Sequence, residues 1–236
     1  MSPRAKARIA GVFYLLEGAT SAFGEIFVVN KLVVSGNAAA TASNILAHES
    51  LLRWGFASAL IAVVCHIVYT VLFYDLFKPV NKTFSLLVAC FSLVAIALQA
   101  ASSLFQYAPL LILRGAVDLS AFTADQVQAL ALLFLKLNLQ AFNIYLVLFG
   151  FWLVLTGYLM VRSIFLPRIV GVLVAFAGLS YLTLLSPSLA NALSPYYLAP
   201  DAVGEPVLIL WLLFVGVNAQ RWTEQAGATG RFGSAR

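Results

Sequence analysis

The sequence predicts an all-α polytopic membrane protein, with six transmembrane helices in one bundle and both termini in the cytoplasm. Two observations on composition and one on charge lead to this fold class. Hydrophobic residues make up 62% of the 236 residues and charged residues only 10%, and the mean hydropathy is +0.96. Ordinary globular domains are roughly a quarter charged. Long apolar runs recur along the chain, and Lys and Arg gather at alternate ends of these runs. We therefore expect the bilayer to be the solvent of this chain.

Each predicted span is long enough, or nearly so, to cross the hydrocarbon layer. A helix that rises 1.5 Å per residue needs about 20 apolar residues to cross roughly 30 Å. The six runs are 9–34, 52–76, 84–113, 125–161, 167–185 and 206–220. We expect them to form one transmembrane domain over residues 1–222. A flexible cytoplasmic tail over residues 223–236 is expected to follow.

Local sequence signals mark several ends of the spans. Pro167 and Pro206 fit the first helical position, where the missing N–H has no helical partner to lose. Thr123, followed three residues later by Gln126, predicts a capping box that opens the fourth span. That span is too long for one straight crossing, so its first turns, including Asn138, are expected to stand in the outer headgroup region or to form a separate interfacial turn.

The loop after the first span is expected to form a short helix at the membrane surface over residues 41–52. Thr41 and Asn44 are good helix-capping residues. The apolar residues of this stretch would face the membrane, while His48 and Glu49 would face water.

The distribution of basic residues predicts the orientation. One side of the predicted membrane carries Arg4, Lys6, Arg8, Lys78, Lys82, Arg162, Arg168, Arg221, Arg231 and Arg236. The opposite side carries only the few remaining Lys and Arg residues. By the positive-inside rule the basic side is cytoplasmic, and so are both termini. The pI of 9.4 is then a topology signal, and no nucleic-acid partner is expected.

Motifs for metal binding and covalent catalysis are missing from the sequence. There is no His-Glu-x-x-His, Cys-x-x-Cys or EF-hand spacing, and no Gly-x-Ser-x-Gly nucleophile motif. Cys65 and Cys90 lie inside apolar runs, where a thiol behaves as a small hydrophobe. We therefore expect no metal site, no cofactor and no catalytic residue that the sequence can identify, and an enzymatic role is disfavoured.

Ionisable residues inside the apolar runs are the main candidates for function. A charged group in hydrocarbon costs about 2.5 to 3.5 kcal/mol on insertion scales, so each needs a partner or a purpose. Glu17 and Glu25 lie in the first span and His66 in the second. Tyr14 and Ser21 share a helical face with Glu17. This face either packs against neighbouring helices or lines a polar pocket, and Glu17 and His66, both near the midplane, are able to meet there.

A second polar cluster is expected toward the outer end of the spans. Gln99 of the third span and Asn143 of the fourth belong to it, together with Glu25. Arg53 is one expected partner of Glu25, because opposite charges at similar depth attract. The cluster consists either of interfacial side chains that reach toward water or of the wall of an outward-facing binding vestibule.

Several short strings resemble those of a known family, in order along nearly the whole chain. They are Arg8-Ile9-Ala10-Gly11, Tyr14-Leu15, Thr41-Ala42-Ser43-Asn44-Ile45-Leu46, His48-Glu49, Phe77-Lys78-Pro79-Val80-Asn81, Gly157-Tyr158-Leu159, Ser163, Leu166-Pro167-Arg168, Gly171, Gly178, Tyr181, Gly204-Glu205 and Leu210-Trp211. In this order they resemble a bacterial multi-pass membrane family, domain of unknown function 4386. The resemblance implies the fold and a bacterial cytoplasmic (inner) membrane location, and it supplies no catalytic residue.

These observations predict an integral membrane protein that binds or transports a small molecule or lipid through a polar intramembrane pocket. Membrane lipids and that ligand are the expected partners, and the oligomeric state stays open. Two alternatives remain: an intramembrane enzyme with Glu17 and His66 as acid and base, or a scaffold or accessory subunit that needs neither. The expected ligand-binding residues are Tyr14, Glu17, Ser21, Glu25, His66, Gln99 and Asn143.

The predicted orientation can be tested with single reporter cysteines in a variant that lacks Cys65 and Cys90. A membrane-impermeant thiol reagent applied to intact cells should label a cysteine at Ser188 and leave one at Asn81 unlabelled, because only the former is expected outside. Labelling at Asn81 in intact cells would contradict the orientation.

Overall fold

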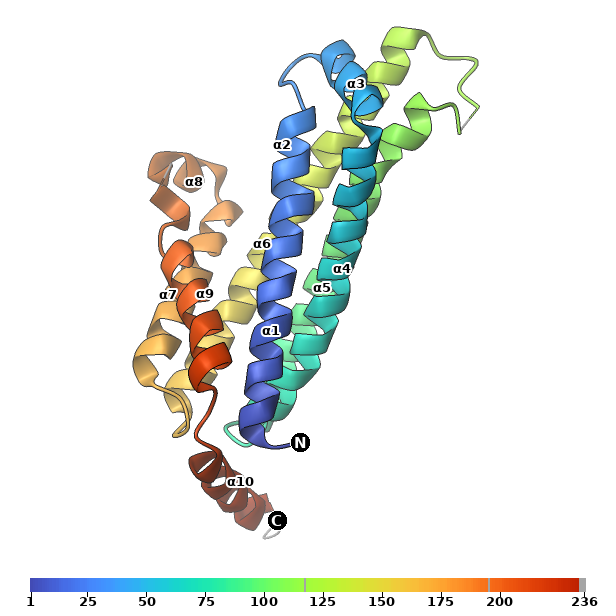
Figure 1. The fold of residues 1–236 in the computed structure, drawn as a ribbon. Helices are drawn as coiled ribbons and strands as arrows, with labels where there is room; N and C mark the ends of the chain where they lie inside the picture. The colour runs from blue at the N-terminus through green and yellow to red at the C-terminus, as the bar shows by residue number, and fades with distance from the viewer. Residues whose placement is uncertain (117, 195, 234–236) are drawn as a thin grey trace. The chain divides into compact units, whose positions relative to one another are not determined.

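The computed structural model describes residues 1–116, 118–194 and 196–233, and these residues form helices joined by short connections, with no strand among them (Figure 1). The predicted all-α class is therefore confirmed. The elements in chain order are α1 (Pro3–Ser21), the π-helix η1 (Ala22–Val28), α2 (Val29–Leu32), α3 (Ala38–Ala47), α4 (Glu49–Phe77), α5 (Lys82–Leu113), α6 (Ala124–Arg162), α7 (Arg168–Leu182), the 3₁₀ turn η2 (Thr183–Leu185), α8 (Pro187–Leu193), the 3₁₀ turn η3 (Tyr196–Leu198), α9 (Asp201–Leu210), the π-helix η4 (Trp211–Val215) and α10 (Ala219–Gly233).

Five of the described helical stretches are long and apolar enough to cross a membrane, and one bent pair of helices forms a sixth candidate. The five are Pro3–Leu32, Glu49–Phe77, Lys82–Leu113, Ala124–Arg162 and Arg168–Leu185. The sixth candidate is Asp201–Val215 with Ala219–Ala228, which are bent by 100° relative to each other. The chain is thus a multi-pass membrane protein.

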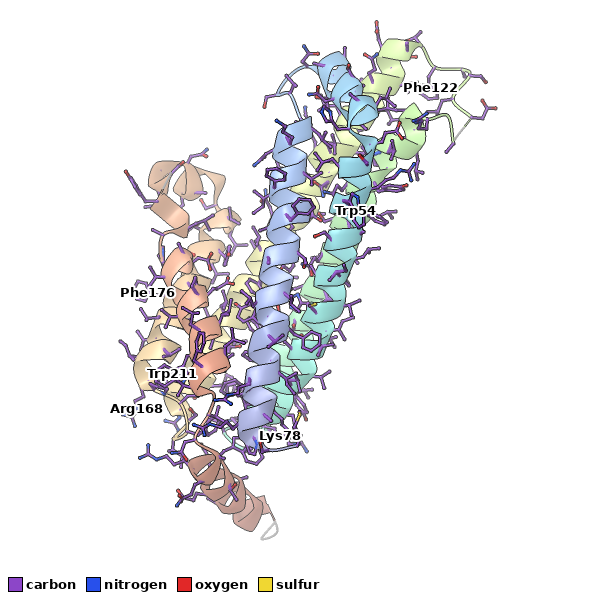
Figure 2. The ribbon with its side chains drawn as sticks, in the orientation of Figure 1. Trp54, Lys78, Phe122, Arg168, Phe176 and Trp211 are labelled. Carbon is purple, nitrogen blue, oxygen red and sulfur yellow. The ribbon has the colours of Figure 1, made fainter. Side chains whose placement is uncertain are left out.

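The surface of these helices has the composition that lipid requires. Large apolar side chains such as Phe27, Val64, Leu104 and Phe176 are more than half exposed. Figure 2 shows Phe176 projecting outward from α7. An exterior this apolar would drive association in water, whereas lipid tails solvate it.

The last span differs from the prediction at both ends. It begins at Asp201, so Pro206 lies inside α9, where the sequence predicts it at the first helical position. The predicted span left out the acidic residues, but α9 accommodates them because Tyr181 donates hydrogen bonds to Asp201 and Glu205. The span ends at Gly216, whose φ of 70° breaks the helix, and α10 then begins in a new direction. Residues 223–233, expected as a flexible tail, are helical within α10.

Other boundaries follow from side-chain caps. Thr123 and Gln126 form the predicted capping box of α6, with Thr123 N–H donating to Gln126 Oε1 at 2.9 Å. Pro167 is the N-cap of α7 and so precedes the first helical residue. The predicted short helix in the first loop is present as α3 but begins at Ala38, because Asn37 Oδ1 accepts from Ala40 N–H at 2.9 Å. Thr41 instead binds the backbone of the preceding bend.

The chain forms two compact units, each assembled from segments that are distant in sequence. Unit 1 consists of residues 1–15, 65–95 and 146–236, and unit 2 consists of residues 16–64 and 96–145. The core of unit 2 is built on Val28, Leu32, Ile45, Leu52, Leu110 and Leu135. The core of unit 1 contains an aromatic cluster whose members are Tyr14, Tyr69, Phe73, Phe149 and Trp152, with ring centroids 5.0 to 6.4 Å apart.

Within unit 1, two glycine pairs allow the backbones of α6 and α7 to touch. A Cβ built on Gly157 would lie 2.5 Å from Gly171 O, and one built on Gly150 would lie 2.8 Å from Gly178 O. The reverse contacts are similarly short. Close approach through small residues is the usual basis of helix packing in lipid, where the hydrophobic effect does not drive helices together.

We predict that Gly157→Ala lowers the free energy of unfolding by about 1 to 3 kcal/mol, because the new methyl group forces the two backbones apart. Gly18→Ala is the matched control, since nothing lies within 4 Å of a Cβ built there and alanine is the better helix former. Thermal unfolding of both variants in detergent micelles would measure the difference. Equal stability of the two variants would contradict the close α6–α7 contact.

Candidate functional site

Glu17 is buried in unit 2 and is held by two neutral donors. Its side chain is 3% exposed. Gln99 of α5 donates from Nε2 to Glu17 Oε1 at 2.8 Å, and the Tyr145 hydroxyl of α6 donates to the same oxygen at 3.2 Å. The carboxyl group of α1 is thus fixed by side chains from two other spanning helices.

Glu25 lies eight residues farther along the first span, inside the π-helix η1. Neutral donors from other helices hold it in the same manner. Asn138 Nδ2 donates to Glu25 Oε2 at 2.8 Å, and the Ser102 hydroxyl donates to it at 3.3 Å. The Ser103 hydroxyl donates to the other oxygen, Oε1, at 3.3 Å. Asn138 and Ser102 also bind each other, so all four residues form one connected network.

The π-helix η1 explains how two acids eight residues apart reach the same pair of partner helices. In a regular α-helix, eight residues turn the chain about 80° past two full turns, so Glu17 and Glu25 would point in different directions. A π-helix closes i→i+5 hydrogen bonds and takes more residues per turn, which reduces this offset. Both acids consequently meet side chains of α5 and α6. Single π-turns inside α-helices are frequent at functional sites.

The partner groups on α5 form a polar stripe along one face. Gln99, Ser102, Ser103 and Gln106 are all fully buried and follow helical spacing. Gln106 Nε2 donates to Gly24 O at 2.5 Å, beside Glu25 in η1. Gln106 Oε1 is buried, and no hydrogen-bond donor reaches it among the described residues. The stripe therefore keeps one acceptor available next to the carboxyl network.

The donors around both acids are amides, a phenol and hydroxyls, none of which carries a charge. Among the described residues, no ion pair joins Glu17 or Glu25. Hydroxyl groups both donate and accept, so they can serve a carboxylate or a protonated carboxyl group. This arrangement can hold the negative charge, a proton or a bound polar ligand without separating an ion pair.

The predicted pairing of Glu25 with Arg53 is wrong. Arg53 Nη1 donates to the Tyr107 hydroxyl at 2.7 Å, and its Nη2 lies 4.0 Å from Glu49 Oε2. Arg114 also forms an ion pair with Glu49. Exposed cations are better solvated at the end of a helix than beside Glu25, whose side chain is only 7% exposed.

His66 lies in unit 1, where it is fully buried. Its Nε2 is 2.9 Å from the Ser92 hydroxyl, which in turn is 2.5 Å from the Thr70 hydroxyl. The imidazole stacks on Tyr69 with ring centroids 4.6 Å apart. Glu17 belongs to unit 2, so its predicted pairing with His66 stays a prediction.

The remaining predicted site residues fall in different surroundings. Gln99, expected in the outer cluster, instead binds Glu17. Ser21 is buried in unit 2 and Asn143 is half-buried there, while Tyr14 belongs to the aromatic cluster of unit 1. Among the described residues, no group of three or more His, Cys, Asp and Glu side chains could hold a metal ion.

Four partners of the two acids were not expected from the sequence. Asn138 was expected among lipid headgroups, yet its side chain is 2% exposed and buried against Glu25. The other three are Ser102, Ser103 and Tyr145. The two serines could have been found from their spacing, since they fall between Gln99 and Gln106 on one helical face. Asn138 lies among other polar residues, including Lys136 and Gln140, and nothing local shows which of them meets an acid. Tyr145 gave no comparable signal, because the residues that directly flank it are apolar.

The fold and this site define a class: a multi-pass α-helical membrane protein with two acids buried among neutral donors in its spanning segments. Comparison with known families is more specific. The family described as "Domain of unknown function (DUF4386)" matches residues 9–216, and the chain belongs to this family. No match was found among curated proteins or solved structures.

We predict that Asn138→Leu lowers the free energy of unfolding by about 1 to 3 kcal/mol, because Glu25 and Ser102 lose a buried hydrogen-bond donor. Asn143→Leu, on the same helix at a half-buried position, is the matched control and should have a smaller effect. Thermal unfolding in detergent would compare them. A larger loss for Asn143→Leu would show that the Glu25 network does not stabilise unit 2.

Proposed function

We propose that this protein binds a small polar molecule within the membrane through Glu17 and Glu25, and that binding is coupled to proton uptake or release at these acids. Such coupling would suit a transporter. The observation that carries the proposal is the set of neutral donors around two buried acids of one spanning helix. Acids inside spanning segments usually pair with another ionisable group or mark a functional pathway, and no ion pair joins these two among the described residues.

The neighbouring stripe on α5 supports a binding role. The buried Gln106 Oε1 offers an acceptor to a ligand donor, and it lies on the same helix face as the residues that hold both acids. The π-helix adds support, because π-turns inside α-helices are frequent at functional sites.

The location and orientation belong to the same proposal. We propose that the protein lies in a bacterial cytoplasmic membrane with both termini in the cytoplasm, because its basic residues gather on one side and its sequence strings resemble a bacterial membrane family. Lys78 and Arg168, which would face the cytoplasm, lie next to the ends of α4 and α7 respectively (Figure 2). Neither the enzyme alternative nor the scaffold alternative has a specific observation in its favour.

The proton-coupled step can be tested without knowing the ligand. The purified full-length protein in phospholipid vesicles would be exchanged between acidic and alkaline buffer while infrared difference spectra are recorded. We expect a carboxyl C=O band that appears on acidification and loses intensity in both Glu17→Gln and Glu25→Gln. Glutamine keeps the shape and hydrogen-bonding capacity of the side chain but cannot titrate. Glu224→Gln is the matched control, because Glu224 is exposed on α10.

Native mass spectrometry of the same preparations would test binding. We expect a small molecule that copurifies with the parent protein and with Glu224→Gln, and whose occupancy falls at least tenfold in Glu17→Gln. If the two buried variants fold and give the spectra and occupancy of the parent at every pH, the acids are packing residues and the proposal is wrong.

A further inference from the structure

A second pair of acids lies in unit 1, on α9. Asp201 and Glu205 are one helical turn apart and therefore lie on the same side of the helix. Both accept from the Tyr181 hydroxyl of α7, at 2.8 Å to Asp201 Oδ2 and 3.3 Å to Glu205 Oε1. Each acid is half-buried, so one side of the pair remains accessible.

The backbones of α7 and α9 hold this pair in place. The two helices lie side by side (Figure 1). A Cβ built on Gly204 would lie 2.6 Å from Leu173 O, so the helices touch directly between the two acidic residues. The positions of the carboxyl groups relative to Tyr181 are therefore set by backbone contact as well as by flexible side chains.

Two buried polar atoms at the acids have hydrogen-bonding capacity to spare. Asp201 Oδ1 is buried, and no donor reaches it among the described residues. The Tyr14 hydroxyl of α1 belongs to a fully buried side chain and lies near enough to Glu205 to interact with it, but no group meets it with ordinary hydrogen-bond geometry among the described residues. Buried polar atoms in native proteins almost always have a partner, so Asp201 Oδ1 in particular indicates a missing donor.

The surroundings combine negative charge with aromatic rings. Tyr181 contacts Phe149 with ring centroids 5.9 Å apart, and Phe149 stacks on Trp152 at 5.2 Å. Tyr181 and Tyr14, which face the two acids, are phenols and carry no positive charge. Residues 186–206, which lead into α9 and include both acids, contain no Lys or Arg.

We propose that Tyr14, Tyr181, Asp201 and Glu205 form a binding site for a primary alkylammonium group. The ammonium would donate one hydrogen bond to Asp201 Oδ1 and another to Glu205. Aromatic rings beside carboxylates attract organic cations through both charge and the ring quadrupole. The Tyr14 hydroxyl would add a further polar group beside Glu205.

The chemistry favours a group with N–H donors over a quaternary ammonium. A primary ammonium has three N–H donors, so it can supply the donor that Asp201 Oδ1 lacks. A quaternary ammonium has none and would leave Asp201 Oδ1 unpartnered.

Thermal shift titrations of the full-length protein in detergent would test the site. The probes are n-butylammonium chloride, tetramethylammonium chloride and sodium chloride at matched ionic strength. We expect saturable stabilisation by n-butylammonium, with an affinity at least tenfold higher than that of tetramethylammonium, and no saturable effect of sodium. The affinity for n-butylammonium should fall at least tenfold in Asp201→Asn and measurably in Tyr14→Phe.

Two further variants separate this site from other effects. Glu205→Gln should also lose the response, and Asp201→Asn keeps the test valid if Glu205→Gln does not fold. Glu17→Gln should bind n-butylammonium like the parent, so that failure of the Glu17 proposal and failure of this one are distinguishable. Saturable stabilisation by sodium alone, equal affinity for the two ammonium ions, or no response to n-butylammonium would each overturn the assignment.

Discussion

The need to satisfy buried carboxyl groups in an apolar solvent determines much of unit 2. A carboxyl group taken out of water without partners costs several kcal/mol, and lipid supplies none. Glu25 therefore requires donors from other helices, and it receives them from Asn138, Ser102 and Ser103. This requirement fixes which faces of α5 and α6 turn toward η1. The apolar residues on the other faces are then left for lipid.

The constraint in unit 1 is steric. Gly157 against Gly171, Gly150 against Gly178 and Gly204 against Leu173 bring three helices into backbone contact. In lipid such contacts replace the hydrophobic effect as the source of helix association, because close packing maximises dispersion and expels lipid chains. The same contacts position Tyr181 over the acids of α9. In this unit, the glycines thus bring the helices together and the polar side chains bond across the same contacts.

The fold accommodates its two acid pairs differently. Glu17 and Glu25 have donors from several helices and are nearly inaccessible, which suits a group that changes protonation inside the protein. Asp201 and Glu205 are half-buried and share one phenol, which suits a group that meets a ligand from outside. The two acid pairs thus differ in how deeply they are buried and in how many donors each carboxyl group receives.

The amino-acid sequence by itself determined the features that depend on local composition. Apolar runs of spanning length gave five spans nearly to their ends, and the Thr123 capping box gave the start of α6. It also singled out Glu17 and Glu25, because acids in apolar runs are rare whatever surrounds them. The sequence missed the start of the last span at Asp201, where acids lie inside the helix. Hydropathy gives a carboxylate the same value whether or not a hydrogen-bond donor meets it.

Only the tertiary structure decided which groups the acids meet. Asn138 reads as a headgroup residue in sequence, since nothing local distinguishes a polar side chain that faces water from one that faces an acid on another helix. The π-helix η1 was equally hidden, because one altered turn leaves hydropathy unchanged while it rotates everything that follows. Partner choice depends on contacts between residues far apart in the chain, and those contacts are a property of the packed helices.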